Sequence, residues 1–251
     1  MFRTTVRAIG TCCLLVLVVP VGAQEKNEDA NNAILDNRVD VLLREWSERT
    51  TKIQTLYAEF TRTEIDKVWR TKESAPGSAR YIHPNRARLD ILGENAQSYV
   101  LTGQGSIWEF RPPKKQIVVW KLPPEEAAKD SLEDGPLPFL FGTRPEKAKM
   151  RYGFKILSEN DKVIHVEVIP KLRKDQQDFV QAEIWLNRQT FLPDRLKFLE
   201  ANGNEMIFEF KQIWTNLEIN PSDFTPKRID KWEFVEKVLG DEPGNAPKVQ
   251  R

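Results

Sequence analysis

Two periodicities of apolar residues divide the chain. Over residues 33–54 the apolar side chains recur mostly every three or four positions, which predicts an amphipathic helix. From Tyr57 onward the period becomes two, in short runs separated by Pro, Gly and Asn, as is typical of antiparallel strands joined by turns. The helical stripe consists of Leu35, Val39, Leu42, Trp46 and Ile53.

Eleven alternating runs predict a mainly β fold, in which the strands follow one another as an antiparallel meander. The last two runs are joined by Ala-Asn-Gly-Asn at 201–204, a favourable hairpin turn. The runs cover residues 58–69, 78–83, 87–92, 98–102, 106–111, 115–122, 152–158, 162–170, 179–187, 191–200 and 205–214.

Three further segments are expected to be partly helical. After a proline pair that ends the sixth run, residues 125–132 predict a short helix with acidic residues near its start. A helical turn or loop is expected at 137–142, in the sequence LPFLFG. Residues 229–251 are expected to form a C-terminal helix, over 229–239, and a flexible tail.

The alternation within the strands assigns side chains to the two faces of the sheet. Trp108 and Phe110 share one face, with Glu109 on the other, and we expect Val118 and Trp120 of the next run to join the face of Trp108. The last run has its own apolar stripe, formed by Met206, Phe208, Phe210 and Trp214. These stripes predict a long curled sheet with one aromatic-rich face, which encloses either a packed core or an apolar cavity.

Residues 1–23 have the features of a cleavable secretory signal. Arg3 and Arg7 precede an apolar run over 12–19, and small residues lead to a cleavage site after Ala23. The run is about half of the roughly 20 residues that a membrane-spanning helix needs, so an uncleaved anchor is the less favoured alternative. A lipoprotein signal is also disfavoured, because its cysteine would follow the apolar run.

Cleavage would leave 228 residues, in which 36 Lys and Arg face 37 Asp and Glu. After a disordered linker at 24–32, this length suits one domain at 33–228. The net charge near zero does not favour nucleic acid as a partner. Both cysteines leave with the signal, whereas seven Trp and 12 of the 13 Phe remain to be buried or to bind something apolar.

Catalytic and cofactor chemistry has little support in the sequence. The two histidines, His83 and His165, are separated by several predicted strands and lack the spacing of a metal site. No serine stands in the G-x-S-x-G context of a hydrolase nucleophile, and there is no phosphate loop or dinucleotide-binding pattern. We therefore predict no catalytic residue, no metal and no cofactor, and an exported hydrolase is the least favoured function.

Five short strings, in order along the chain, resemble segments of the LolA family of periplasmic lipoprotein carriers. LYAEFTR at 56–62 is similar to the family's F-T-Q segment, and GSARYIHPN at 77–85 resembles its G-x-L-W-x-x-R-P-N string. LTGQGSIWEFRP at 101–112, LPFLF at 137–141 and PSDFTP at 221–226 resemble its L-W-x-Y-x-P, lid and closing F-x-F-x-P strings. Each string is weak alone, but their order and spacing are specific.

The resemblance implies an unclosed antiparallel β-barrel with a helical lid, whose apolar concavity holds the acyl chains of a lipoprotein in the periplasm. Burial stabilises such chains by about 0.8 kcal/mol per CH₂ group. A monomeric carrier of this kind would receive its cargo from an inner-membrane donor and deliver it to an outer-membrane acceptor. The residues implied in lipid binding are Trp108, Phe110, Val118, Trp120, Leu89, Phe139, Leu140 and Phe141.

His83 stands where the family has an arginine that hydrogen-bonds the lid, so it is the expected lid latch. A neutral imidazole donates one hydrogen bond where a guanidinium offers five, which predicts a weaker latch. The leading hypothesis is a non-enzymatic carrier of acylated ligands. The alternative is an interaction or sensory module with the same half-barrel that transports nothing.

Overall fold

A computed structural model of the chain describes residues 37–122 and 144–238. Within them, twelve strands form one sheet in the order β12-β6-β5-β4-β3-β2-β1-β11-β10-β9-β8-β7. Neighbouring strands run antiparallel, except that β12 lies parallel to β6. The strands are β1 (Thr55–Asp66), β2 (Thr71–Ile82), β3 (Arg86–Ile91), β4 (Gln97–Thr102), β5 (Ser106–Arg111), β6 (Gln116–Lys121), β7 (Tyr152–Glu159), β8 (Val163–Pro170), β9 (Gln181–Asn187), β10 (Pro193–Leu199), β11 (Glu205–Thr215) and β12 (Glu233–Val238).

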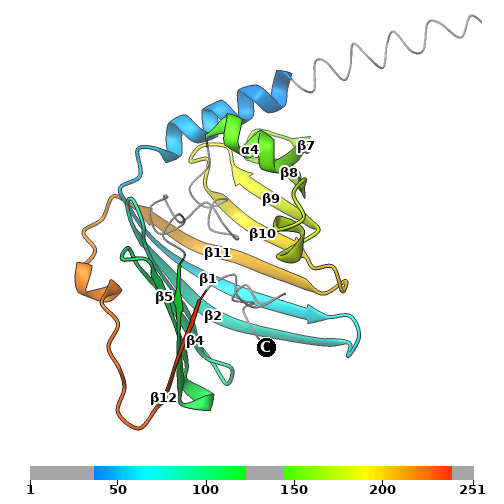
Figure 1. Cartoon of the computed structure of the whole chain (residues 1–251). Coiled ribbons are helices and arrows are strands. Elements are labelled where there is room, and N and C mark those ends of the chain that lie inside the picture. Colours follow the sequence, from blue (N-terminus) through cyan, green and yellow to red (C-terminus); the bar gives the residue numbers. More distant parts are fainter. Residues whose placement is uncertain (1–36, 123–143, 239–251) are drawn as a thin grey trace, which may run out of the picture.

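The sheet curls without closing (Figure 1). Its two edge strands, β12 and β7, stand at opposite ends of the strand order and do not pair with each other in the part of the chain that the structure describes. This confirms the predicted unclosed antiparallel half-barrel. Each of the strands β1 to β11 overlaps one of the eleven predicted runs, although the first run extends beyond β1 and β2 begins well before its run at 78–83. Strand β12 is additional.

A long helix, described over residues 37–50, precedes β1 as the apolar stripe predicted. Arg38 donates to the carboxylate of Glu159 on β7 at 2.5 and 3.1 Å, and Lys149 donates to Asp40 at 2.6 Å. The helix therefore lies across the end of the sheet that contains β7 (Figure 1). Its buried apolar side chains are Leu42, Leu43 and Trp46.

A second helix, α4 (Pro145–Arg151), precedes β7 and was not predicted. Only Ala148 is buried in it, so it lacks the apolar stripe by which a helix is recognised in a sequence. No helix within the described ranges is long and apolar enough to cross a membrane. The helix predicted at 125–132 and the segment predicted at 137–142 lie outside the described residues.

The face of the sheet that packs against the long helix, here called the inner face, carries the hydrophobic core. At its centre, the Phe60 ring is 1% exposed and meets the rings of Phe208 and Phe210 at 5.3 and 6.0 Å. Gly77 on β2 lies opposite Phe60, and a methyl group there would come within 2.5 Å of the Phe60 ring. The close approach of the ring therefore requires glycine at position 77.

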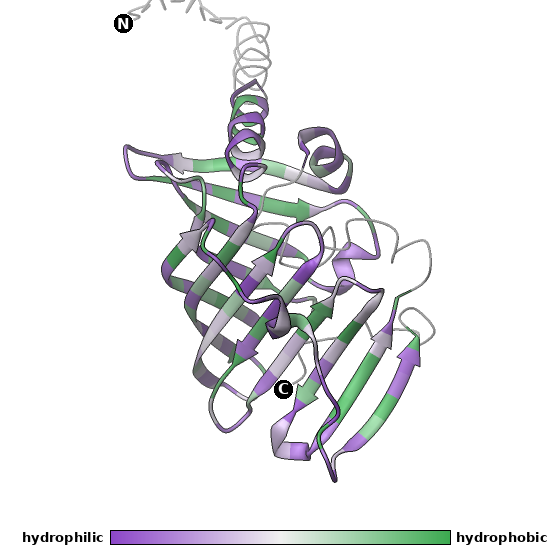
Figure 2. Cartoon of the chain, turned by 90° about the vertical axis from the view of Figure 1, so that its left-hand side faces the viewer, coloured by the Kyte–Doolittle hydropathy of each residue, from purple (hydrophilic) through white to green (hydrophobic). Residues whose placement is uncertain are grey.

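Residues 216–232, here called the strap, connect β11 to β12 across the outer face of the sheet (Figure 2). Its 3-10 helix η4 (Pro221–Phe224) lies over β3 and β4, and Phe224 is 3% exposed. Arg88 on β3 donates to the backbone oxygen of Asp223 at 3.1 Å. The strap thus covers part of the outer face, over β3 and β4.

The prediction of a helix at 229–239 is wrong, because Glu233–Val238 is strand β12. Its backbone pairs with the edge of β6, where unpaired N–H and C=O groups would otherwise remain. Phe234 also packs against the ring of Trp108, with centroids 5.6 Å apart. These long-range contacts decide the structure of a segment whose apolar spacing suits a short helix as well as a strand.

Candidate functional site

The pairing between β5 and β6 decides which of the predicted lipid-binding side chains face inward. Ile107 packs against the core of the inner face and lies opposite Trp120. Since cross-strand neighbours share a face, Trp120 faces inward, and so does Val118 two residues earlier. Leu89 on β3 also packs against this core. Three of the predicted residues therefore lie on the inner face.

Trp108 and Phe110 face outward, so the prediction that they share a face with Trp120 is wrong. The turn between the two strands places Trp108 opposite Val119, which joins even-numbered residues of β5 to odd-numbered residues of β6. Alternation within each strand does not contain this information, because the register depends on the turn.

Trp108 and Phe110 belong to a separate outer cluster. Their rings stack with centroids 6.3 Å apart, and Phe234 of β12 meets Trp108 edge-on. The guanidinium of Arg228 in the strap lies 3.7 Å from the centre of the Phe234 ring. The packing of β12 and the strap thus accounts for these aromatic residues, and they are not part of the candidate site.

A register shift moves one aromatic residue of β11 to the outer face. The pairing of β1 with β11 is irregular between Glu59 and Phe60, and beyond that point Trp214 lies opposite Tyr57 and stacks on it at 5.3 Å. The prediction that Trp214 shares the face of Phe210 is therefore wrong, because a bulge changes the parity of a strand. The inner-face residues of the stripe are Met206, Phe208 and Phe210.

Six of the half-buried apolar side chains that pack against the core of the inner face are grouped on two parts of the sheet. They pack against the core but keep part of their surface exposed, and they come from β3, β5 and the end of β6 on one side and from β11 on the other. Partly exposed apolar surface of this kind is suited to an apolar ligand. These residues, here called the apolar band, are Leu89, Ile107, Leu122, Met206, Phe210 and Ile213.

A buried carboxylate lies on the same face, next to the apolar band. Glu109 is 0% exposed and accepts hydrogen bonds from Arg111 Nε and Nη2 at 2.7 and 2.9 Å. The indole N–H of Trp120 donates to it at 3.1 Å and the hydroxyl of Tyr99 at 3.4 Å. The sequence predicts that Glu109 and Trp108 lie on different faces of the sheet, but it does not indicate that the face of Glu109 is the buried one.

Tyr99 connects this carboxylate to a second arginine. Burial raises the pKa of the Tyr99 hydroxyl far above its usual value, and the negative charge of Glu109 raises it further. The positive charges of Arg62 and Arg111 oppose that rise, so both lie near the hydroxyl. Arg62 on β1 is itself 5% exposed and lies 3.0 Å from Glu64. The polar cluster, as it is called here, consists of Arg62, Glu64, Tyr99, Glu109 and Arg111.

His83, the predicted lid latch, lies exposed in the turn between β2 and β3. Its backbone N–H donates to the backbone oxygen of Gln54 at 2.8 Å, and Nδ1 of its ring is 3.2 Å from the hydroxyl of Tyr81. The lid segment that it would hold lies outside the described residues, so the latch stays a prediction. The predicted lid residues lie outside them too, namely Phe139, Leu140 and Phe141.

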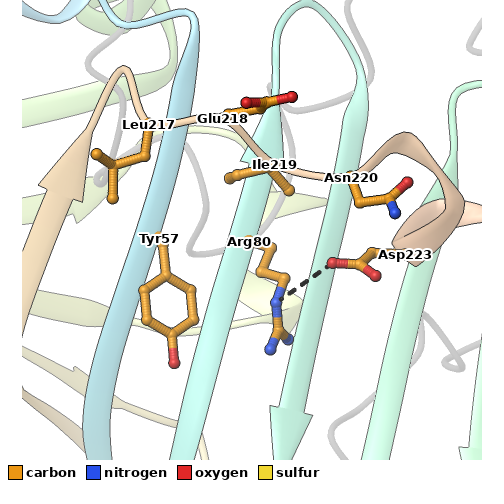
Figure 3. Close-up of a pocket in the computed structure, with 7 residues that line it drawn as sticks. All are labelled: Tyr57, Arg80, Leu217, Glu218, Ile219, Asn220 and Asp223. Atoms are coloured by element: carbon orange, nitrogen blue, oxygen red, sulfur yellow. Dashed lines mark ion pairs between the residues drawn. The ribbon is translucent and has the colours of Figure 1, made fainter.

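A pocket of about 230 Å³ opens on the outer face, where the strap leaves β11 (Figure 3). Arg80 and Tyr57 point into it from the sheet, and Asp223 from the strap. Arg80 donates to Asp90 at 2.8 Å and lies 3.7 Å from Asp223, so two carboxylates already engage its charge. This pocket is on the opposite side of the sheet from the apolar band.

No group of three or more His, Cys, Asp or Glu side chains within 37–122 and 144–238 is arranged to hold a metal ion. The second histidine, His165, lies on the outer face of β8, between the core residues Ile164 and Val166. Its Nε2 is 2.9 Å from the carboxylate of Glu183, and its ring stacks on Trp185 at 4.3 Å. Its contacts are thus those of a paired outer-face residue.

Comparison with known proteins adds a family to this geometry. The family model described as outer membrane lipoprotein carrier protein LolA matches residues 51–227. No curated protein sequence matches the chain. Among solved structures, an uncharacterized conserved protein from Thermus thermophilus is similar, with a TM-score of 0.50 and 9% identity over 78% of this chain and 97% of that one.

Two further solved structures are similar at lower TM-scores. Lipoprotein LppX of Mycobacterium tuberculosis has a TM-score of 0.41 and 10% identity, over 74% of this chain and 98% of that chain. MucB of Pseudomonas aeruginosa, in its complex with MucA, has a TM-score of 0.42 and 17% identity, over 76% of this chain and 61% of that chain. The family match, which includes β1 to β11, is the more informative finding.

Proposed function

The chain belongs to the LolA family of outer membrane lipoprotein carrier proteins, and on that premise we propose that it binds the acyl chains of lipoproteins, or of other lipids, and carries them across the periplasm. The family fold is a non-enzymatic binding scaffold. The proposal includes export, with cleavage after Ala23, in keeping with the extracytoplasmic location of the family. The single observation that supports it best is the apolar band on the inner face.

The inner-face residues divide into two roles. Val118 and Trp120 are 2% and 4% exposed, so we propose that they form the floor beneath the ligand. Half-buried residues such as Leu89 and Phe210 would contact it directly. Each CH₂ group that leaves water on this surface contributes about 0.8 kcal/mol, so a chain of a dozen carbons gains substantial affinity.

Phe210→Gln is expected to weaken the binding of an apolar fluorescent probe, N-phenyl-1-naphthylamine, by about tenfold or more, because the aromatic ring supplies roughly 1.5–3 kcal/mol of apolar contact. Trp214→Gln, on the outer face of the same strand, is the matched control and is expected to leave the dissociation constant unchanged. Fluorescence titration measures both values. Equal weakening in the two variants would contradict an inner-face site.

One further control excludes binding to exposed apolar residues elsewhere. Trp69 and Val68, at the tip of the hairpin between β1 and β2, are 75% and 71% exposed. A Trp69→Ser variant should therefore bind the probe as the wild type does. Loss of probe binding in this variant would instead assign the signal to the hairpin tip.

Carriage and simple binding are separated by a transfer assay. A carrier is expected to move a fluorescent diacylated lipopeptide from donor vesicles to acceptor vesicles at a rate proportional to protein concentration. Lipid that co-purifies with the protein, identified by mass spectrometry, would agree with this. Probe binding without any transfer would favour the interaction or sensory module over the carrier.

A further inference from the structure

Arg62 places a charge on the apolar inner face, two positions after Phe60 on β1. It lies opposite Phe208 on β11 and Ala75 on β2, and it is 5% exposed. Its Nη2 is 3.0 Å from the carboxylate of Glu64. Its Nε and Nη1 are buried and have no hydrogen-bond partner among the described residues.

Buried N–H groups without an acceptor are rare, because each has lost its hydrogen bond to water and gained none in return. The neighbouring donors of the polar cluster are engaged, since Arg111 and Tyr99 both donate to Glu109. Arg62 is therefore the member of the cluster with donors to spare. Such a side chain calls for an oxygen acceptor that the described residues do not provide.

The surroundings of Arg62 restrict what that acceptor is. Glu64 compensates the positive charge, so a full negative charge on the ligand is not required and a carbonyl oxygen suffices. Phe60, two positions earlier on β1, and Phe208, opposite Arg62 on β11, have their rings 5.3 Å apart, and these apolar neighbours favour an apolar group next to the oxygen. A carbonyl oxygen joined to an apolar chain is the head of an acyl group.

We propose that Arg62 binds the carbonyl oxygen, of a carboxylate or an ester, at the head of an acyl chain whose tail lies on the apolar band. This deepens the proposed function and rests on it, because it assigns the ligand an orientation on the inner face. Strand β5 also has an apolar side chain followed by a polar one on the inner face, since Ile107 of the apolar band is followed by Glu109 of the polar cluster.

The test is displacement of N-phenyl-1-naphthylamine, which lacks oxygen, by dodecanoic acid and by methyl dodecanoate. Arg62→Met alone would leave the Glu64 carboxylate without its ionic partner Arg62. The variant to use is therefore Arg62→Met/Glu64→Gln, in which both side chains are neutral and which is expected to fold at least as well as the wild type. We expect it to bind the probe with an affinity within about twofold of the wild type, but both oxygen-bearing ligands at least tenfold more weakly.

Glu64→Gln alone is the matched control, because it keeps the guanidinium and removes the compensating charge. It should bind methyl dodecanoate as the wild type does and dodecanoate more tightly, which distinguishes the ester from the free acid as ligand. Equal affinities of the double variant and the wild type for both ligands would overturn the role of Arg62, as would a parallel loss of probe binding. Failure of the wild type to bind the probe would instead overturn the proposed function itself.

Discussion

Replacing Glu109 with leucine is expected to lower the free energy of unfolding by about 3–5 kcal/mol. The carboxylate is 0% exposed and accepts hydrogen bonds from Arg111, Trp120 and Tyr99. Leucine would leave the Arg111 guanidinium, whose side chain is 14% exposed, without its ionic partner. Urea unfolding followed by far-UV circular dichroism measures the difference between the variant and the wild type.

Glu209→Leu provides the matched control on an outer-face glutamate. Its side chain is 57% exposed and its carboxylate lies 4.0 Å from Arg195, so the expected change is within about 0.5 kcal/mol. A loss below about 1 kcal/mol for Glu109→Leu, or equal losses in the two variants, would show that the polar cluster does not contribute to stability as the geometry indicates.

Phe60→Ala is expected to cost about 3–5 kcal/mol, since it removes an aromatic ring from the centre of the core. The ring is 1% exposed and packs edge-on against Phe208 and Phe210. The same unfolding experiment applies. A cost under about 2 kcal/mol would mean that the surrounding side chains collapse into the space, contrary to a rigid inner face.

The contact between Phe60 and Gly77 allows a second check on the same ring. Gly77→Ala places a methyl group 2.5 Å from the ring and 2.7 Å from the backbone oxygen of Asp90, so it is expected to cost about 1–3 kcal/mol. In the Phe60→Ala background the ring is gone, and the added cost of the alanine should be smaller. Strict additivity of the two changes would contradict the contact.

The strands were predictable because local alternation and turn residues act on neighbouring positions. The runs that became β1 to β11 are bounded by Pro, Gly and Asn, and each has the period of two that a sheet with one buried face imposes. The long helix was predictable for a similar reason, because Leu42 and Trp46 occupy one stripe and both are buried.

The candidate site was harder to predict because it depends on how strands pair. Whether Trp108 or Trp120 faces inward follows from the conformation of the turn at 112–115, where Lys115 adopts a left-handed backbone with φ of 47°. A change of one residue in that register would exchange the two faces of β6. The irregular pairing beside Phe60 has the same effect on Trp214.

The polar cluster and β12 depend on contacts between residues far apart in the sequence. Glu109 and Arg62 look like solvent-facing positions of alternating strands, but the pairing of the strands puts both on the buried side, where both charges act on the hydroxyl of Tyr99. The segment Glu233–Val238 becomes a strand because β6 offers it a free edge. Neither relation has a local sequence signal.

Photo-crosslinking shows whether an acyl chain lies on the inner face. A dodecanoic acid with a diazirine at its far end is bound, irradiated with and without excess unlabelled acid, and the labelled residues are mapped by mass spectrometry. We predict competable labelling of the apolar band, at Ile107 or Ile213. Competable labelling of outer-face residues such as Trp108 or Trp214, with none on the inner face, would instead assign the acyl chain to the outer face.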